Sequence, residues 1–253
     1  MKLSIITVAY NSASTICDTM DSVLCQDYPD LEYIVVDGCS TDDTLLKIKD
    51  YSNRFEGRMK WISEKDDGIY DAMNKGLALA TGDIVGIINS DDVYTDNKVL
   101  SLVMDTFEAN PQIGAVTGNL HIVSQDLKKK IRYYSSKYCT PRMFRFGLIP
   151  AHPTFFVRRK YYEQWGGYNT TFNISGDFDL MVRFLKVHKL PYKYLDYDMV
   201  AMRIGGASSQ DIWTYIVENN KNVIRACTNN NVYTNFIMVS FRYFFKFFHL
   251  IFK

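Results

Sequence analysis

Residues 63–94 read SEKDDGIYDAMNKGLALATGDIVGIINSDDVY, a helix pattern followed by a strand pattern. The segment from Ile69 to Leu79 predicts a helix, which Thr81-Gly82 ends. Asp83 to Ile88 (DIVGII) is apolar and rich in β-branched side chains, so it predicts a buried strand. This strand leads directly into the polar cluster Asn89-Ser90-Asp91-Asp92. A polar cluster directly after a buried strand is typical of α/β proteins, which bind ligands beyond their strand ends.

The residues before this stretch repeat the alternation of strand and helix. Short apolar runs predict strands at 3–9, 31–36 and 59–62, and apolar residues at helical spacing follow Asn11-Ser12 and Ser40-Thr41-Asp42. Strand–helix–strand units of this length form right-handed crossovers. We therefore predict an α/β fold whose mostly parallel central sheet is flanked by helices.

The second half of the chain is less regular. Its predicted strands are 113–123, 154–157 and 192–202, and its predicted helices are 159–165, 177–188 and 211–226. Lys128 to Tyr134 is polar and basic, which predicts a solvated loop or an edge strand.

Composition excludes several classes of protein. The 253 residues are 47% hydrophobic and 23% charged, as in ordinary globular proteins. A net charge of +1 gives no general attraction to nucleic acid. The five cysteines are scattered without a C-x-x-C pair, which excludes the common zinc and redox motifs. The apolar run at the N-terminus is too short for a signal peptide, so we expect a cytoplasmic protein.

Acidic residues follow three of the predicted strands. Asp37, Asp66-Asp67 and Asp91-Asp92 would meet at the carboxyl edge of the sheet, where such folds bind ligands. Mg²⁺ and Mn²⁺ take one or two protein carboxylates and complete their shell with phosphates and water. The alternatives are an Asx turn at Asp91-Asp92 and a helix cap after Asp37. Neither the glycine-rich dinucleotide fingerprint nor the P-loop motif occurs.

Two residues of the second half are candidates for catalysis or binding. Asp177 begins a predicted helix, and Asp179, two residues on, cannot share its helix face. The alternative for Asp177 is a plain helix cap. His152, in the segment PAHPTFF, is the histidine best placed for a cleft, and we assign it to the acceptor pocket.

The order of six segments resembles the family-2-type glycosyltransferases of the GT-A fold. The segments are SIITVAYN, YIVVDGCSTDDT, the stretch 63–94, HPTFFVRR, GGYN and GDFDLMVR, and together they span about residues 3 to 206. The resemblance is strongest to the bacterial branch that builds O-antigen, capsule and other surface polysaccharides. It implies a GT-A domain at 1–207, with a nucleotide-sugar half at about 1–110 and an acceptor half at 111–207.

The resemblance also implies roles for individual residues. The implied donor-binding residues are Thr7, Tyr10, Asn11, Asp37, Asp66, Asp71, Asn74, Lys75, Asn89 and Ser90. Asn89-Ser90-Asp91 occupies the family's D-x-D position, so Asp91 would bind Mn²⁺ or Mg²⁺, with Asp92 as a second ligand or an orienter. Asp177 matches the catalytic base. Arg203 would neutralise the leaving diphosphate, and its alternative is an ordinary surface or edge-strand arginine.

Two departures from the family pattern carry information. Asn89 replaces the first acid of D-x-D and brings no charge. The Q-x-x-R-W block of processive synthases is replaced by RIGGASS at 203–209, which argues for transfer of a single sugar.

The implied activity is metal-dependent transfer with inversion, from a nucleotide-sugar, most simply a UDP-sugar, to a lipid-linked or glycan acceptor. The sugar, the base and the oligomeric state stay open. The alternatives are a sugar nucleotidyltransferase and an inactive membrane-bound scaffold of the same fold.

The C-terminal region, 208–253, predicts helices that end in an amphipathic tail. Residues 236–252 are almost wholly apolar, and Arg242, Lys246, His249 and Lys253 fall on one helical stripe. We expect segment 235–253 to lie in the membrane interface, with its cations at the headgroups, which places the enzyme peripherally on the inner face of the cell membrane. The alternatives are a helix packed on the domain or at a dimer interface, and a true membrane span.

Overall fold

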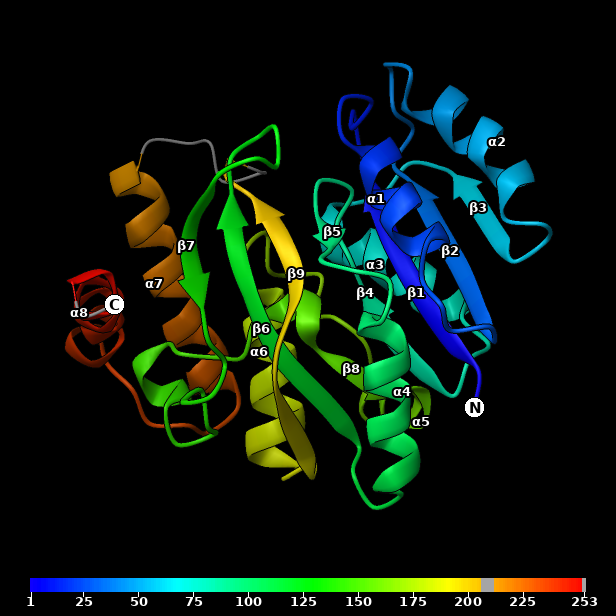
Figure 1. Cartoon of the computed structure of the whole chain (residues 1–253). Helices are drawn as coiled ribbons and strands as arrows, with labels where there is room; N and C mark the ends of the chain where they lie inside the picture. The colour runs from blue at the N-terminus through cyan, green and yellow to red at the C-terminus, as the bar shows by residue number, and fades with distance from the viewer. Residues whose placement is uncertain (206–211, 252–253) are drawn as a thin grey trace.

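The computed structural model describes residues 1–205 and 212–251, and the side chains of 212–215 and 244–251 lie outside the description. In the described ranges, nine strands form one sheet in the order β3-β2-β1-β4-β8-β6-β9-β5, with β7 paired to β6. Helices flank this curled sheet (Figure 1). The predicted α/β architecture is confirmed.

The N-terminal half forms the parallel part of the sheet. Strands β1 (Leu3–Ala9), β2 (Leu31–Asp37), β3 (Met59–Ser63) and β4 (Ile84–Ile87) alternate with helices α1 (Ile16–Leu24), α2 (Thr44–Arg54) and α3 (Ile69–Leu79). Strand β1 pairs with β2 on one side and with β4 on the other, so the strand order reverses beside it. Open α/β sheets bind ligands at such a reversal, beyond the carboxyl ends of the strands.

The central strands are buried on both faces. Every residue of β1 and β2 is buried. Tyr33 and Val35 of β2 enter a core shared with α1, α2 and α4, whereas Ile34 and Val36 enter a core shared with α3 and α6. Helix α3 approaches β1 so closely that a Cβ on Gly76 would collide with Ile6. This alternation explains why both strands read as continuous apolar runs.

The second half has thirteen elements within the described ranges. They are β5 (Val93–Tyr94), α4 (Val99–Ala109), β6 (Ala115–Val123), β7 (Lys130–Tyr134), the 3₁₀ turns η1 (Phe144–Phe146) and η2 (His152–Thr154), β8 (Phe156–Arg158), α5 (Arg159–Trp165), α6 (Gly176–Met181), the π-helical η3 (Val182–Val187), β9 (Tyr192–Arg203), α7 (Ile212–Asn229) and α8 (Phe236–Ile251). Strands β6 and β9 are parallel, whereas β8 is antiparallel to both β4 and β6.

Several sequence-based boundaries need correction. The helix predicted over 177–188 changes from α-helical to π-helical after Met181. The strand predicted from Thr154 begins at Phe156, because the preceding residues form a 3₁₀ turn with Pro153 in its first positions. Strand β5 and helix α4 were not predicted. The basic segment after residue 128 contributes the edge strand β7.

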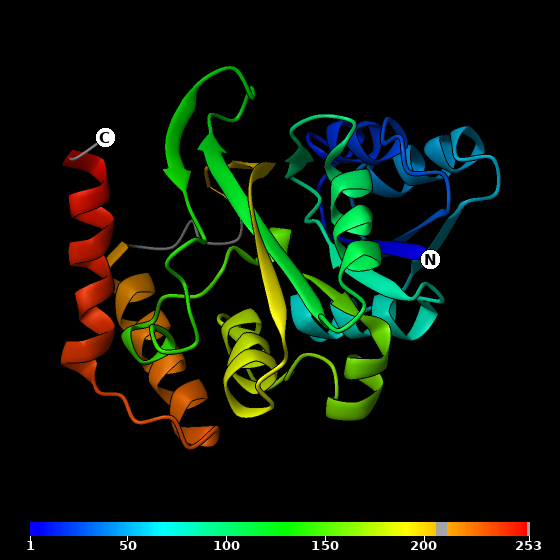
Figure 2. The same ribbon diagram turned by 60° about the horizontal axis from the view of Figure 1, so that its bottom comes forward.

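Helices α7 and α8 lie on the opposite side of β6 and β9 from the parallel strands, as both views show (Figures 1 and 2). Helix α8 packs against α7 and η1. Val239 is fully buried and Arg242 is only 5% exposed. The expectation that Arg242 points to lipid headgroups is therefore wrong, because its side chain is buried within the protein.

Parts of the predicted tail cannot be compared with the structure. The side chains of Lys246 and His249, the residue Lys253 and the expected boundary at 207/208 lie outside the described residues. Over the described residues, no helix is both long and apolar enough to cross a membrane.

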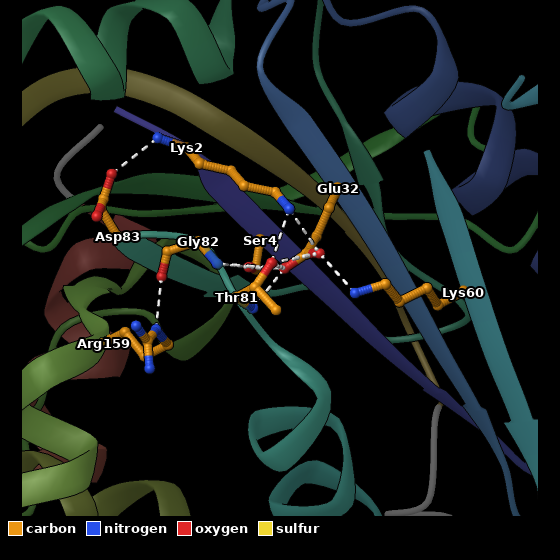
Figure 3. A network of polar contacts seen from close by, with 8 residues as sticks. All are labelled: Lys2, Ser4, Glu32, Lys60, Thr81, Gly82, Asp83 and Arg159. Atoms are coloured by element: carbon orange, nitrogen blue, oxygen red, sulfur yellow. Dashed lines mark hydrogen bonds and ion pairs between the residues drawn. The ribbon is translucent and has the colours of Figure 1, made fainter. Parts of the chain in front are cut away.

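The amino-terminal edge of the sheet is held by a buried carboxylate (Figure 3). Glu32 of β2 accepts hydrogen bonds from Ser4 Oγ at 2.6 Å, from Thr81 Oγ1 at 2.8 Å and from the Gly82 amide at 3.2 Å. Lys2 and Lys60 pair with it at 3.0 and 3.1 Å. Burial by itself would raise the pKa of Glu32, but these hydrogen bonds outweigh it and hold the pKa far below its usual value. The charge is thus fully compensated.

Candidate active site

A cleft of about 1120 Å³ opens where β1 and β4 end. Its lining includes the segments after these two strands together with residues of α3, α6, α7, α8 and β9. The predicted site residues that line it are Tyr10, Asn11, Asp66, Asn89, Ser90, Asp91, Asp92, Asp177 and Arg203. The topology thus brings residues from both halves of the chain to one cavity.

The polar turn after β4 contains buried oxygens without donors. The turn is closed by a 3.1 Å hydrogen bond from the Asp92 amide to the Asn89 carbonyl. Asp92 is 1% exposed, and Asn89 Nδ2 donates to its Oδ2 at 3.2 Å. The remaining oxygens, Oδ1 of Asp92 and Oδ1 of Asn89, are buried and have no partner in the described part of the chain. Such unpaired oxygens are costly unless something occupies the site, and oxygen is the ligand that hard divalent cations prefer.

The pKa shifts of the two carboxylates in this turn also favour a bound cation. Burial raises the pKa of Asp91, and the charge of Arg203 partly opposes the shift. Burial, followed by the adjacent charge of Asp91, raises the pKa of Asp92 well above its usual value. Two neighbouring buried carboxylates repel one another, and a bound cation would relieve that repulsion. In the described residues no cluster of three His, Cys, Asp or Glu side chains forms a complete metal site.

Arg203, at the end of β9, is only 4% exposed and bonds to three other segments of the chain. Its Nε donates to the Gln125 carbonyl at 2.9 Å and its Nη1 to the Asp91 carbonyl at 2.6 Å. Its Nη2 pairs with Asp18 of α1. Arg203 therefore fixes the backbone of the acidic turn while lining the cleft, and the alternative of an ordinary surface arginine is wrong.

Asp177 lies in the first turn of α6 and lines the same cleft as the acidic turn. Ser175, whose φ of 69° is left-handed, occupies the N-cap position of this helix, so Asp177 lies inside the helix and not at its cap. Tyr70 of α3 donates to Asp177 Oδ1 at 3.3 Å. Asp179 points elsewhere, as expected, and pairs with Arg183 at 3.0 Å. The plain helix cap is therefore not the role of Asp177.

Aromatic residues form a series of contacts that begins at Asp177. The Tyr70 ring stacks on Tyr168, with centroids 5.7 Å apart. Tyr168 in turn shares a 2.7 Å hydrogen bond with His152 Nε2. Burial lowers the pKa of His152, while the nearby charge of Asp177 opposes the shift. His152 is not among the residues that line this cleft and supports Tyr168, and its place in an acceptor pocket stays a prediction.

Thr7 and Asp37 lie in the interior of the protein. Both are fully buried, and neither is among the lining residues. Thr7 Oγ1 accepts a 2.9 Å hydrogen bond from Tyr33. Asp37 accepts hydrogen bonds from the Ser40 amide at 3.2 Å and from Ser63 Oγ at 2.6 Å. A direct contact of Asp37 with a nucleotide base stays a prediction.

The predicted donor-side helix residues also lie away from the cleft lining. Asn74 exchanges two 2.8 Å hydrogen bonds with the backbone of Tyr168 and so joins α3 to the following loop. Lys75 pairs with Glu64 at 3.1 Å and with Asp71 at 3.4 Å. These hydrogen bonds and ion pairs give Asp71, Asn74 and Lys75 structural roles.

The loops after β1, β2 and β3 meet beside the cleft. A Cβ on Gly38, after β2, would collide with the carboxylate of Asp66, after β3, so glycine permits these two loops to approach. Asn11, with a left-handed φ of 49°, accepts a 2.8 Å hydrogen bond from the Thr41 amide. Tyr10 is 63% exposed beside them. An exposed ring and a carboxylate at one end of a cleft suit a nucleoside.

Two residues that line the cleft were not assigned to it from the sequence. Tyr70 directly precedes Asp71 in the quoted stretch, and its contact with Asp177 spans more than a hundred positions. Arg242 lines the cleft from α8, and the signal for it was a cation inside an apolar helix. That signal was interpreted as a membrane pattern.

Comparison with known proteins identifies the family. The family model described as "Glycosyl transferase family 2" matches residues 4–174, more than half of the chain. The chain belongs to glycosyl transferase family 2. The enzyme is therefore a glycosyltransferase, which sets aside the alternative of a sugar nucleotidyltransferase.

The relatives include a biosynthetic glycosyltransferase and a polysaccharide synthase. The transferase is 26% identical over 209 residues to the PGL/p-HBAD biosynthesis glycosyltransferase of Mycobacterium bovis, covering 83% of this chain and 79% of the relative. It is 33% identical over 121 residues to the poly-β-1,6-N-acetyl-D-glucosamine synthase of Staphylococcus epidermidis, covering 47% of this chain but only 29% of the synthase.

Solved structures confirm the GT-A fold. S. aureus TarS 1-349 in complex with UDP-GlcNAc superposes with a TM-score of 0.71 at 20% identity, covering 92% of this chain and 68% of that one. The mannosyltransferase PcManGT of Pyrobaculum calidifontis, in complex with GDP-Man and Mn²⁺, superposes with a TM-score of 0.63 at 20% identity, covering 88% and 64%.

Proposed function

We propose that the enzyme transfers one sugar with inversion from a nucleotide-sugar, a UDP-sugar in the first instance, to a lipid-linked glycan acceptor during synthesis of a cell-surface polysaccharide. The observation that carries the proposal is the shared cleft, which is lined by both the acidic turn and Asp177. Donor complexes of TarS and PcManGT, which share the fold, support a nucleotide-sugar.

The residues of the acidic turn fit a divalent cation. Asp91 and Asp92 would hold Mn²⁺ or Mg²⁺, with the unpaired Oδ1 of Asp92 as one ligand atom. When bound, the cation supplies positive charge that stabilises the leaving nucleoside diphosphate. Asn89 contributes an amide oxygen in place of a charge, and Arg203 holds the turn in position.

Asp177 performs the proton transfer in this proposal. It faces the cleft, so its carboxylate accepts the proton of the acceptor hydroxyl while that oxygen attacks the anomeric carbon. Attack from the side opposite the diphosphate inverts the configuration. Tyr70 orients the carboxylate through Oδ1 and leaves the other oxygen for the proton.

The test is release of nucleoside diphosphate from a panel of UDP-, GDP- and dTDP-sugars, with a sugar joined to a short alkyl chain through diphosphate as the acceptor. We expect one donor class to be turned over with Mn²⁺, and Asp177→Asn to keep donor binding but lose turnover. Equal turnover by wild type and Asp177→Asn would contradict the assignment of the base. Binding of donors by wild type without any turnover would instead favour the inactive scaffold.

We also propose that α8 binds the inner face of the cell membrane. Phe236 and Phe241 are about half exposed, and Ile237 is 80% exposed. Apolar side chains on an amphipathic helix insert at the lipid boundary. Ile237→Asp should reduce sedimentation with anionic vesicles, whereas Val217→Asp, at a 39% exposed site on α7, should leave it unchanged. Equal losses, or none, would contradict the proposal.

A further inference from the structure

The second buried arginine of the cleft lacks a counter-charge. Arg203 and Arg242 are 4% and 5% exposed, and both line the cleft. Arg203 pairs with Asp18. Arg242 has no carboxylate partner among the described residues and donates only to Asn220 Oδ1 at 2.6 Å and Tyr243 Oη at 3.1 Å. A buried guanidinium without an anion is costly, so the structure calls for one from outside.

Unused donors at this place define the chemistry of the missing group. The Nε of Arg242 and the Nδ2 of Asn220 are buried and have no partner in the described chain. Asn220 is 1% exposed, and its neighbour Asn219 lines the cleft. Two adjacent N–H donors, one of them on a guanidinium, bind an oxyanion.

The position of Arg242 separates it from the donor end of the cleft. It comes from α8, which lies on the opposite side of β6 and β9 from the strands that carry the nucleotide half (Figures 1 and 2). Gly147 packs against it, since a Cβ there would lie 3.0 Å from Arg242 Cδ. Next to it in sequence, Phe241 is about half exposed. The arginine thus lies between the cleft and an apolar surface.

We propose that Arg242 and Asn220 form an anion-binding subsite for the phosphoryl group of an amphiphilic acceptor. This inference rests on the proposed function and names the part of the acceptor that the enzyme recognises. An acceptor whose sugar is joined to a lipid through phosphate places an anion between sugar and chain. That anion would pair with Arg242, while the sugar extends toward Asp177 in the same cleft.

Calorimetry with hexyl diphosphate in the presence of EDTA tests the subsite without donor or metal. We expect binding to wild type, and a dissociation constant raised about tenfold or more in Arg242→Gln. Arg145→Gln is the matched control, because Arg145 also carries a buried, unpartnered Nε but does not line the cleft. It should change the constant by less than about twofold. Equal losses in the two variants would overturn the proposal.

The source of the anion is tested with two further probes. Hexyl diphosphate should bind more tightly than inorganic pyrophosphate, and neutral hexyl glucoside should not bind at this site. If pyrophosphate bound as tightly as hexyl diphosphate, the site would be one for a free anion, and the proposal of an amphiphilic acceptor would be wrong. If hexyl glucoside bound as tightly as hexyl diphosphate, the proposal that this subsite recognises an anion would be wrong.

A second variant separates binding from folding. Asn220→Asp supplies the missing carboxylate beside Arg242, so we expect a higher melting temperature together with weaker binding of hexyl diphosphate. Unchanged binding by a stabilised Asn220→Asp would overturn the proposal. If hexyl diphosphate fails to bind while donor turnover is intact, the subsite alone is wrong. Absence of turnover with every donor would instead reject the proposed function.

Discussion

Each edge of the sheet contains a buried carboxylate, and the two carboxylates differ in how many hydrogen bonds and ion pairs they make. At the amino-terminal edge, Glu32 receives hydrogen bonds from Ser4, Thr81 and Gly82 and pairs with two lysines (Figure 3). At the carboxyl edge, Asp92 Oδ2 accepts a hydrogen bond from Asn89, whereas its Oδ1 has no partner in the described part of the chain. The pKa of Glu32 is lowered and that of Asp92 is raised, because hydrogen bonds outweigh burial at Glu32 but not at Asp92. The compensated charge of Glu32 stabilises the fold, whereas the incompletely compensated charge of Asp92 indicates the candidate cation site.

The largest effect is expected on catalysis, from two carboxylates of one helix. Asp177→Asn should lower sugar transfer on the order of 10³-fold, because the acceptor hydroxyl loses its base. Its melting temperature should stay close to that of wild type. Asp179→Asn is the control: it breaks the buried pair with Arg183 and should lower the melting temperature instead. Steady-state kinetics and calorimetry check the pair, and interchanged effects would contradict the assignment.

Loss of the compensated carboxylate should mainly affect stability. Glu32→Gln should lower the free energy of unfolding by about 3 kcal/mol, because it removes the anion that Lys2 and Lys60 surround. The pKa of Glu32 is lowered by folding, so its contribution is present above the unfolded pKa and is lost as the pH falls below about 4.5. Urea titrations between pH 3 and 7 should show this loss in wild type and a flatter profile in Glu32→Gln. A parallel profile would contradict the role of Glu32.

The uncompensated carboxylate should behave in the opposite sense. Asp92→Asn should raise the stability of the metal-free enzyme by about 1 kcal/mol at neutral pH, because it removes a buried charge. The pKa of Asp92 is raised by folding, so its ionisation weakens the fold as the pH rises above the unfolded value. The gain should vanish in excess Mn²⁺, which stabilises only wild type. Denaturation with EDTA and with Mn²⁺ measures both, and a destabilised metal-free variant would contradict the site.

The smallest effect is expected at Tyr70. Burial, followed by the charge of Asp177, raises the pKa of this phenol well above its usual value, so it remains a donor. Tyr70→Phe should lower kcat about threefold with little change in KM for the donor, since one orienting hydrogen bond is lost. Tyr162→Phe, a nearby buried tyrosine that does not line the cleft, should leave kcat unchanged. The same loss in both variants would indicate a packing effect.

The first half of the fold followed from sequence because its signals are local. Strands of continuous apolar residues and the acidic turn at 89–92 lie where their patterns predict them. The resemblance to a known family then supplied the fold name and the position of Asp177. Helix α4 was missed although its buried residues Val99, Leu100, Val103, Met104 and Phe107 recur at helical spacing. The 3₁₀ turn at His152 was missed because its three residues are too few to show a period.

The remainder of the site depends on tertiary contacts. His152 was assigned to an acceptor pocket from its neighbours in sequence, and those neighbours could not reveal its hydrogen bond with Tyr168. Arg242 was assigned to lipid because its helix is apolar, whereas packing on α7 turns it toward Asn220. Neither orientation can be derived from helical spacing, because spacing defines a face but not what that face contacts.

The most direct measurement is a thermal-shift panel of UDP, GDP, dTDP and CDP, each with and without Mn²⁺, on wild type and Asp91→Ala. One nucleotide should raise the melting temperature of wild type by about 5 °C with Mn²⁺ present, through ligand linkage. The shift should disappear without Mn²⁺ and in Asp91→Ala. An equal shift in Asp91→Ala, or one that is independent of Mn²⁺, would contradict the assignment of the uncompensated carboxylates to a cation and a nucleotide diphosphate.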